Sequence, residues 1–218
     1  MEDIEIINLW KSYDKKLDEH LLLNQKNAED ITKMKVKSVL SSMRPLKIFT
    51  ILIGVAWVGF VDILIINLLN VANPFFLLSA GIQVLLTKLA IGIYLYQLIL
   101  IHQVDTTAPI LATQEKIARL KSSTLWVARL LFLQLPVWTT FYWNKSMLQN
   151  GNALLYALQF IVTASFVFAA IWLFRNIKYE NRDKKWFKFI FSGNEWKPVM
   201  KSMELLDLIK EYEKGNPN

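Results

Sequence analysis

Residues 56–69 read AWVGFVDILIINLL, an apolar run that a single carboxylate, Asp62, interrupts. The run is part of a longer apolar block that covers residues 48–69. The hydrocarbon core of a bilayer is about 30 Å thick, and a helix of roughly 20 apolar residues can cross it. The block therefore predicts a transmembrane helix, and Asp62 raises the question of what holds a charge inside it.

Three further blocks of similar length follow in a chain of 218 residues that is 54% hydrophobic. They cover residues 75–101, 125–143 and 153–174. A backbone in lipid must pair its amides and carbonyls within its own segment, which favours helices. We therefore expect an all-α fold: an integral membrane four-helix bundle with cytosolic N-terminal and C-terminal helices. The expected regions are a helical N-terminal region (1–44), a four-span domain (45–178) and an amphipathic tail (179–218).

Lysine and arginine are distributed very unevenly between the two sides of these spans. Residues 1–47 carry nine, residues 102–124 carry three and the tail after Phe174 carries ten, whereas the two opposite links carry only Lys145. Basic residues near spans stay on the cytoplasmic side, so we expect both termini to be cytoplasmic. Attraction to an anionic lipid surface accounts for the basic residues, and we expect no nucleic-acid partner.

The N-terminal region has the pattern of an amphipathic helix. It contains no Gly or Pro before Pro45, and its apolar residues recur in steps of three and four. The sequence leaves open two helices, the second capped by Asn27, or one long helix with a weak joint near residues 24–27. The recurring apolar residues are Ile7, Trp10, Tyr13, Leu17 and Leu21. They predict a contact face for a helical partner, or a face that packs on the tail helix.

Several residues predict where helices begin and end. Pro45 can start the first span, and Asn73 followed by Pro74 can cap and start the second. Pro136 is expected to kink the third span. We also expect a short link helix around residues 113–121 and a tail helix over residues 197–213.

Charged and polar side chains interrupt the spans at similar depths. Asp62 lies about 10 Å and Lys88 about 20 Å from the outer ends of the first two spans, at 1.5 Å per residue. Helical side chains lean toward their own N-terminus, so in an antiparallel hairpin Asp62 and Lys88 lean toward each other. Gln83 and Gln159 lie at about 12 and 9 Å and are expected to complete a polar layer. The layer is either a buried structural pair that fixes the helix register or the lining of a path for an ion or small ligand. A third alternative is that Asp62 and Lys88 make no contact, and that Lys88 reaches toward the interface or a partner subunit supplies the counter-charge.

Chemical motifs are lacking. The chain has no cysteine and only two histidines, and it contains no phosphate-binding glycine loop or hydrolase motif. We therefore expect no enzymatic activity, no cofactor and no metal site.

The stretch LWKSYDKKLDEHLLLNQKNAEDITKMKVKSVLSSMRPLKIF resembles a family of small, uncharacterised bacterial inner-membrane proteins with four spans and a polar helical N-terminus. The resemblance covers residues 8–69 and is carried by Leu9-Trp10 and the 21–24 region. It implies a location in the bacterial inner membrane. Some members neighbour extracytoplasmic-function sigma factors and are presumed to be anti-sigma-like. The chain lacks the zinc-binding His and Cys pattern of many anti-sigma domains.

Taken together, these features favour a membrane-anchored interaction or regulatory protein that holds a cytosolic helical partner. Two alternatives stay open: a small transporter or channel component that uses Asp62 and Lys88, and a structural subunit of a membrane complex. The expected partners are the lipid bilayer and a cytosolic protein, and a homo-oligomer stays open as well.

Overall fold

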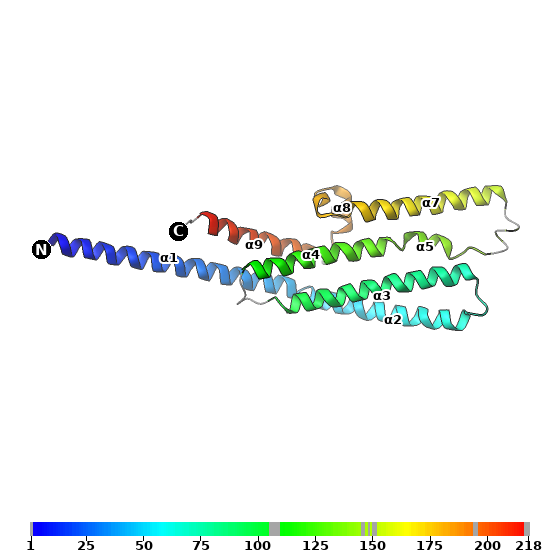
Figure 1. The fold of residues 1–218 in the computed structure, drawn as a ribbon, viewed down its shortest axis with the longest axis horizontal. Helices are drawn as coiled ribbons and strands as arrows, with labels where there is room; N and C mark the ends of the chain where they lie inside the picture. Colours follow the sequence, from blue (N-terminus) through cyan, green and yellow to red (C-terminus); the bar gives the residue numbers. More distant parts are fainter. Residues whose placement is uncertain are drawn as a thin grey trace.

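The computed structural model describes residues 2–104, 110–144, 147, 149, 152–193 and 196–215. The described residues form helices and the turns between them, which confirms the all-α prediction. Figure 1 shows an elongated molecule in which one long helix extends well beyond the rest.

That long helix is α1 (Glu2–Ser41), and it is followed by α2 (Arg44–Leu68). Of the two alternatives that the sequence left open, one long helix is confirmed: α1 runs without interruption through Asn24 and Asn27, and no joint is present near residues 24–27. Asparagine is only a moderately weak helix former, so two of them do not end a helix of this length. The chain is interrupted instead at residues 42–43, and Pro45 lies in the first turn of α2 as predicted.

Helix α3 (Pro74–His102) turns back along α2 to form an antiparallel hairpin. Asn73 caps α3 as predicted: its side-chain oxygen accepts a hydrogen bond from the amide of Phe75. Along the hairpin, Gly54 lets the two helices approach closely, because a Cβ atom built there would lie 3.2 Å from the Ile91 side chain.

The third predicted span is divided between two helices. Helix α4 (Ile110–Phe132) begins before the expected link helix and continues past it, so the prediction of a separate short helix over 113–121 was wrong. Helix α5 (Leu135–Thr140) starts beside Pro136, where the sequence predicts a kink. The amides of Leu133 and Gln134 still bond to carbonyls three or four residues before them, so the break is a tight turn within an almost continuous rod.

The remaining elements are α7 (Ala153–Asn176), a short 3-10 helix η1 (Tyr179–Asn181), α8 (Lys185–Ile190) and α9 (Lys197–Gly215). Asn152 caps α7 by accepting from the amide of Leu154. Helix α9 agrees with the predicted tail helix, because α9 begins at Lys197.

The apolar helices lie side by side in the order α2, α3, α4 with α5, and α7 (Figure 1). Extensive contacts join each helix to the next, but α2 and α7 do not pack extensively on each other. The arrangement among the described residues is thus an open layer, and the predicted four-helix bundle is not confirmed. In the part of the chain that the structure describes, three helical stretches are long and apolar enough to cross a membrane, namely 6–68, Pro74–His102 and Ala153–Asn176.

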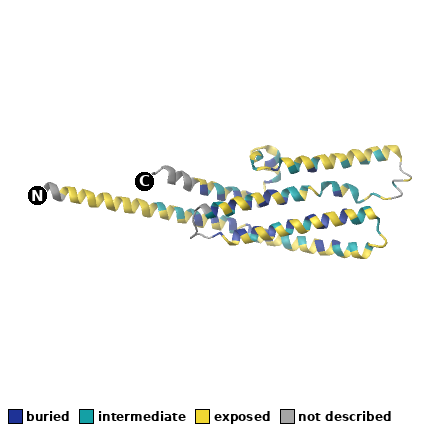
Figure 2. Cartoon of the chain, in the orientation of Figure 1, coloured by how far each residue is buried: buried dark blue, intermediate teal, exposed yellow. Residues whose placement is uncertain are grey.

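The best-packed core lies where α1, α3, α4 and α9 meet, and we call it the junction core. Its members are Val36, Leu40, Met43, Leu100, Ile101, Val104, Ile117, Leu120, Val199 and Leu206. Burial is concentrated here and along α3, whereas α7 and the far half of α1 are largely exposed (Figure 2). Long apolar helices with exposed apolar faces are typical of membrane proteins, because lipid covers such faces.

Candidate functional site

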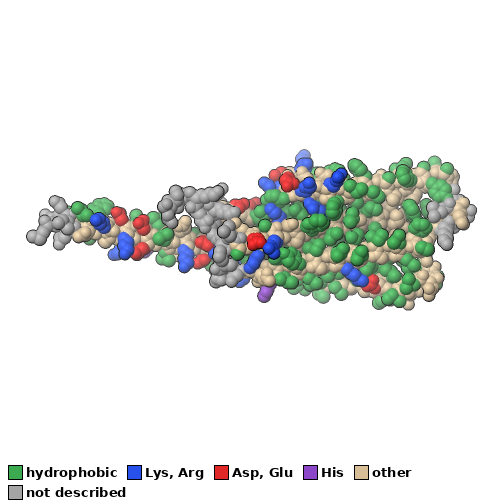
Figure 3. All heavy atoms as spheres, viewed as in Figure 1, with side chains coloured by type: hydrophobic (Ala, Val, Ile, Leu, Met, Phe, Trp, Pro, Cys, Tyr) green, Lys and Arg blue, Asp and Glu red, His purple; other side chains and the backbone are tan. Residues whose placement is uncertain are grey.

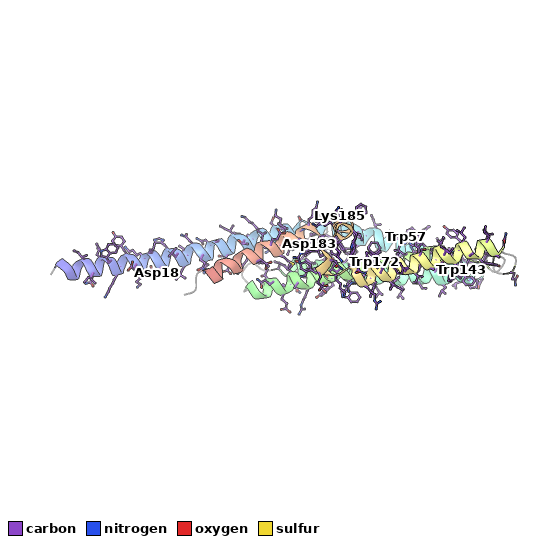
Figure 4. The ribbon with its side chains drawn as sticks, turned by 90° about the horizontal axis from the view of Figure 1, so that it is seen from above. Asp18, Trp57, Trp143, Trp172, Asp183 and Lys185 are labelled. Atoms are coloured by element: carbon purple, nitrogen blue, oxygen red, sulfur yellow. The ribbon has the colours of Figure 1, made fainter. Side chains whose placement is uncertain are left out.

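The five apolar residues predicted as a contact face lie on the part of α1 that projects away from the other helices. Residues 6–24 are exposed throughout, and Trp10 has 67% of its surface accessible. The spacing places the five on one side of the helix, within about one third of its circumference. We call Ile7, Trp10, Tyr13, Leu17 and Leu21 the N-terminal stripe. Figure 4 shows Asp18 on the same projecting segment, far from Trp143 at the opposite end of the molecule.

The described part of the tail helix does not cover the N-terminal stripe. Helix α9 packs on α1, but it does so at the junction core, through Val199 and Leu206 against Val36 and Leu40. The apolar side chains of the stripe are each about half exposed or more. Helix α1 is therefore held at one end by four-helix packing, while its other end presents an uncovered apolar face.

Asp62 and Lys88 form an ion pair across the α2–α3 hairpin, with 2.8 Å between Oδ2 and Nζ. The pair is not enclosed among the helices as the sequence suggested. The side chain of Lys88 is 52% exposed and that of Asp62 is 38% exposed. In Figure 3 blue and red side chains interrupt the hydrophobic surface over α2 and α3.

The four polar residues expected to form one layer do not come together. Gln83 is buried on another side of α3. The amide of Gln159 donates to the Thr139 carbonyl on α5, at 2.8 Å, and so ties α7 to α5. Among the described residues, no hydrogen bond joins either glutamine to the ion pair. Sequence depth alone placed them at one level, but depth does not specify the direction in which each side chain points.

A buried polar group at the start of α2 was missed by the sequence analysis. Lys47 is fully buried; its ammonium donates to the Gln97 side-chain oxygen and lies 4.8 Å from the centre of the Tyr94 ring. Because Lys47 directly precedes the first predicted span, the sequence analysis counted it among the cytoplasmic basic residues. The predicted hairpin could have indicated this contact, because Tyr94 and Gln97 lie on the part of α3 that passes the start of α2.

A second basic residue, Arg129, binds the backbone at the C-terminal end of α7. Two nitrogens of Arg129 donate to the carbonyl oxygen of Ile177, at 2.9 and 2.7 Å, and the guanidinium lies near the Trp126 and Phe174 rings. A cation at a helix C-terminus satisfies carbonyls that lack helical partners and favours the helix dipole. Arg129 therefore connects α4 to the last turn of α7.

A cavity of about 680 Å³ lies between α7 and the segment that precedes it. It is almost entirely apolar, and its lining includes Trp143, Tyr156, Gln159 and Phe160. It does not include Asp62 or Lys88. Within the described part of the chain, no group of three or more His, Asp or Glu side chains is placed to hold a metal ion.

The chain was compared with known proteins, and no family model, no curated protein and no solved structure matches it. Its function therefore has to be argued from the surfaces described above.

Proposed function

We propose that this protein is a membrane-anchored interaction protein that presents the N-terminal stripe of α1 to a helical partner in the cytosol. One observation supports this above all. Five large apolar side chains lie on one side of a helix that projects beyond the other helices, and no described residue covers them. Partners of such helices pack apolar residues against positions spaced by three and four.

The membrane anchor consists of four crossings in the inner membrane, with both termini in the cytosol. Helices α2, α3 and α7 have the required length and composition. The third crossing is the stretch from Leu125 to Trp143, which spans about 28 Å at 1.5 Å per residue despite the turn at residues 133–134. Broken helices are tolerated in membranes where neighbours satisfy their polar groups, and here Gln134 donates to Thr87 of α3.

The class of partner follows from the resemblance in residues 8–69: a soluble helical regulator, held at the membrane in an anti-sigma-like role. The ion pair gives less support to a transport role, because both side chains are partly exposed and neither lines the cavity beside α7. The junction core supports an anchoring role, since it fixes the base of α1 rigidly to the other helices.

Site-specific photocrosslinking in native membranes tests the proposal. A photoreactive residue replaces Leu21 in the full-length protein, and crosslinked proteins are identified by mass spectrometry. Leu17→Lys should abolish the crosslink. Leu23→Lys is the matched control, because Leu23 has similar exposure (54% against 59%) but lies about 120° around the helix.

The proposal requires the crosslinked species to be one soluble regulatory protein whose capture depends on Leu17 and not on Leu23. Equal loss in both variants, or crosslinks only to lipid or to the tail of the same chain, would contradict it. Circular dichroism of each variant checks that α1 stays helical.

A further inference from the structure

The exposed Asp62–Lys88 ion pair is costly where it lies. Lys88 is at the midpoint of α3, equally far from both ends of a 29-residue helix. A charge at the centre of a span costs about 2.5–3.5 kcal/mol on insertion scales, and long side chains near helix ends lower this cost by reaching the interface. From the midpoint Lys88 cannot reach either interface, and contact with Asp62 leaves about half of its side chain uncovered.

An ion pair on an outer face is complementary to a copy of itself. A two-fold axis along the membrane normal preserves depth, so both pairs lie at one level. The same rotation exchanges left and right, which brings α2 of each copy opposite α3 of the other. The interface then contains two equivalent contacts, each between Asp62 of one copy and Lys88 of the other, as two-fold symmetry requires. The result is a square of four alternating charges, enclosed by protein.

The surroundings of the pair allow two copies to approach closely. Gly59, Gly81 and Gly92 are exposed, and a Cβ atom added at any of them would meet nothing within 4 Å beyond its chain neighbours and the backbone of its own helix. Their spacings of three, seven and four residues from Asp62 or Lys88 place them on the same face of α2 or α3. Packing within the chain does not explain these glycines, whereas small residues let transmembrane helices pack closely against each other.

We infer that the α2–α3 face is the interface of a homodimer in the membrane, in which each ion pair is covered by the ion pair of a second copy. This inference is independent of partner binding by α1. A different membrane protein or lipid would have to provide its own matching charges at the same depth, whereas a second copy carries them already.

Mixing charge variants separates an interaction between copies from one within a chain. Asp62→Lys gives a chain with two positive groups at the site, and Lys88→Asp gives a chain with two negative groups. Each variant alone should dimerise about tenfold more weakly than the wild type, because polar contacts between membrane helices contribute roughly 0.6–1.7 kcal/mol each. Mixed together in nanodiscs or mild detergent, the two variants should form a heterodimer as readily as the wild type dimerises. A pair that acts only within one chain cannot be rescued by mixing.

Cysteine crosslinking with a bifunctional maleimide gives a second measurement in a chain that has no native cysteine. Ile66→Cys is exposed one turn beyond Asp62, and the reagent should join it across the two-fold axis to Ile66→Cys of the second copy, because the two α2 helices lie diagonal to each other. Phe168→Cys, equally exposed but on α7, is the control and should not crosslink. Gly81→Leu should abolish the Ile66→Cys crosslink without lowering the thermal stability of the detergent-solubilised monomer.

Equal crosslinking at Ile66→Cys and Phe168→Cys, together with failure of the mixed variants to associate, would overturn the inference. Crosslinking of Ile66→Cys to a different membrane protein instead of a second copy would overturn it as well.

Discussion

Lys47 is enclosed completely near the start of α2, where its ammonium lies between Gln97 and the Tyr94 ring. Moving a charged group out of water costs several kcal/mol, and only well-formed contacts in the interior offset that cost. The contacts of Lys47 come from α3, so this one side chain links the two helices of the hairpin near its open end. Arg44, one turn earlier, donates to the Ile101 carbonyl of α3 and so acts in the same place.

Replacing the acceptor of Lys47 should weaken the hairpin. Gln97→Leu removes a hydrogen bond to a charged group, and we expect a loss of about 2 kcal/mol in the free energy of unfolding. Gln97→Glu keeps an acceptor and should retain stability. Thermal unfolding in detergent measures both, with the exposed Gln103→Leu as the control. Equal stability of Gln97→Leu and Gln103→Leu would show that this contact has no net effect.

Arg129 provides a second test at the scale of one side chain. Arg129→Met leaves the buried Ile177 carbonyl without either of its two donors, and we expect a loss of about 2 kcal/mol in unfolding free energy. Arg129→Lys should lose part of this, because an ammonium cannot reproduce the two-nitrogen geometry. Arg175→Met, exposed in the last turn of α7, should change little in the same thermal unfolding experiment.

At the scale of helices, the sequence predicted termini well where a residue has a strong local effect. Asn73 with Pro74, and Pro136, mark helix starts because a side-chain cap or a missing amide acts within one turn. The sequence left open whether α1 continues through Asn24 and Asn27, and it did not predict the length of α4. Both features depend on the weak helix propensities of single residues, which the summed propensities of the neighbouring residues override.

The outward direction of the Asp62–Lys88 pair could not be derived from one span at a time. Helical spacing places both residues on the hairpin, but which face remains uncovered depends on where α4 and α7 pack. The same reason explains why Gln159 bonds to α5 rather than joining the pair. The burial of Lys47 likewise depends on the register between α2 and α3.

The packing of α9 on α1 leads to a testable prediction at the scale of helices. Leu206 is buried in the junction core, and Leu206→Ala should cost about 2–5 kcal/mol through lost packing and a residual cavity. Because α9 packs mainly on α1 and α4, we expect local release: amide hydrogen exchange should accelerate in α9 and in residues 36–40 of α1, but not in α3. Lys201→Ala, exposed on α9, is the control. Unchanged protection of α9 in Leu206→Ala would contradict the described packing.

At the scale of the whole molecule, the proposed function gives different roles to the open layer and to the projecting helix. The layer leaves apolar faces of α2 and α7 uncovered, which suits lipid and, around the ion pair, a second copy. The junction core holds the base of α1 with contributions from α3, α4 and α9. A two-residue interruption at 42–43 separates α1 from α2. From the N-terminal stripe to this interruption α1 rises 1.5 Å per residue, so a bound partner would be held at a fixed distance of a few tens of ångströms from the membrane.

The proposed four crossings can be tested with single cysteines, because the natural chain has none. Asn70→Cys and Gln149→Cys mark the turns between spans, and Ser12→Cys and Lys201→Cys mark the helices α1 and α9. The uneven distribution of lysine and arginine predicts that both turns lie outside and both of these helices inside. A membrane-impermeant maleimide should therefore label Asn70→Cys and Gln149→Cys in intact cells. It should label Ser12→Cys and Lys201→Cys only after permeabilisation. Labelling of Asn70→Cys without Gln149→Cys would mean that the broken α4–α5 rod does not cross. The chain would then have two spans if Lys201→Cys stays protected in intact cells, and three, including α7, if Lys201→Cys is labelled.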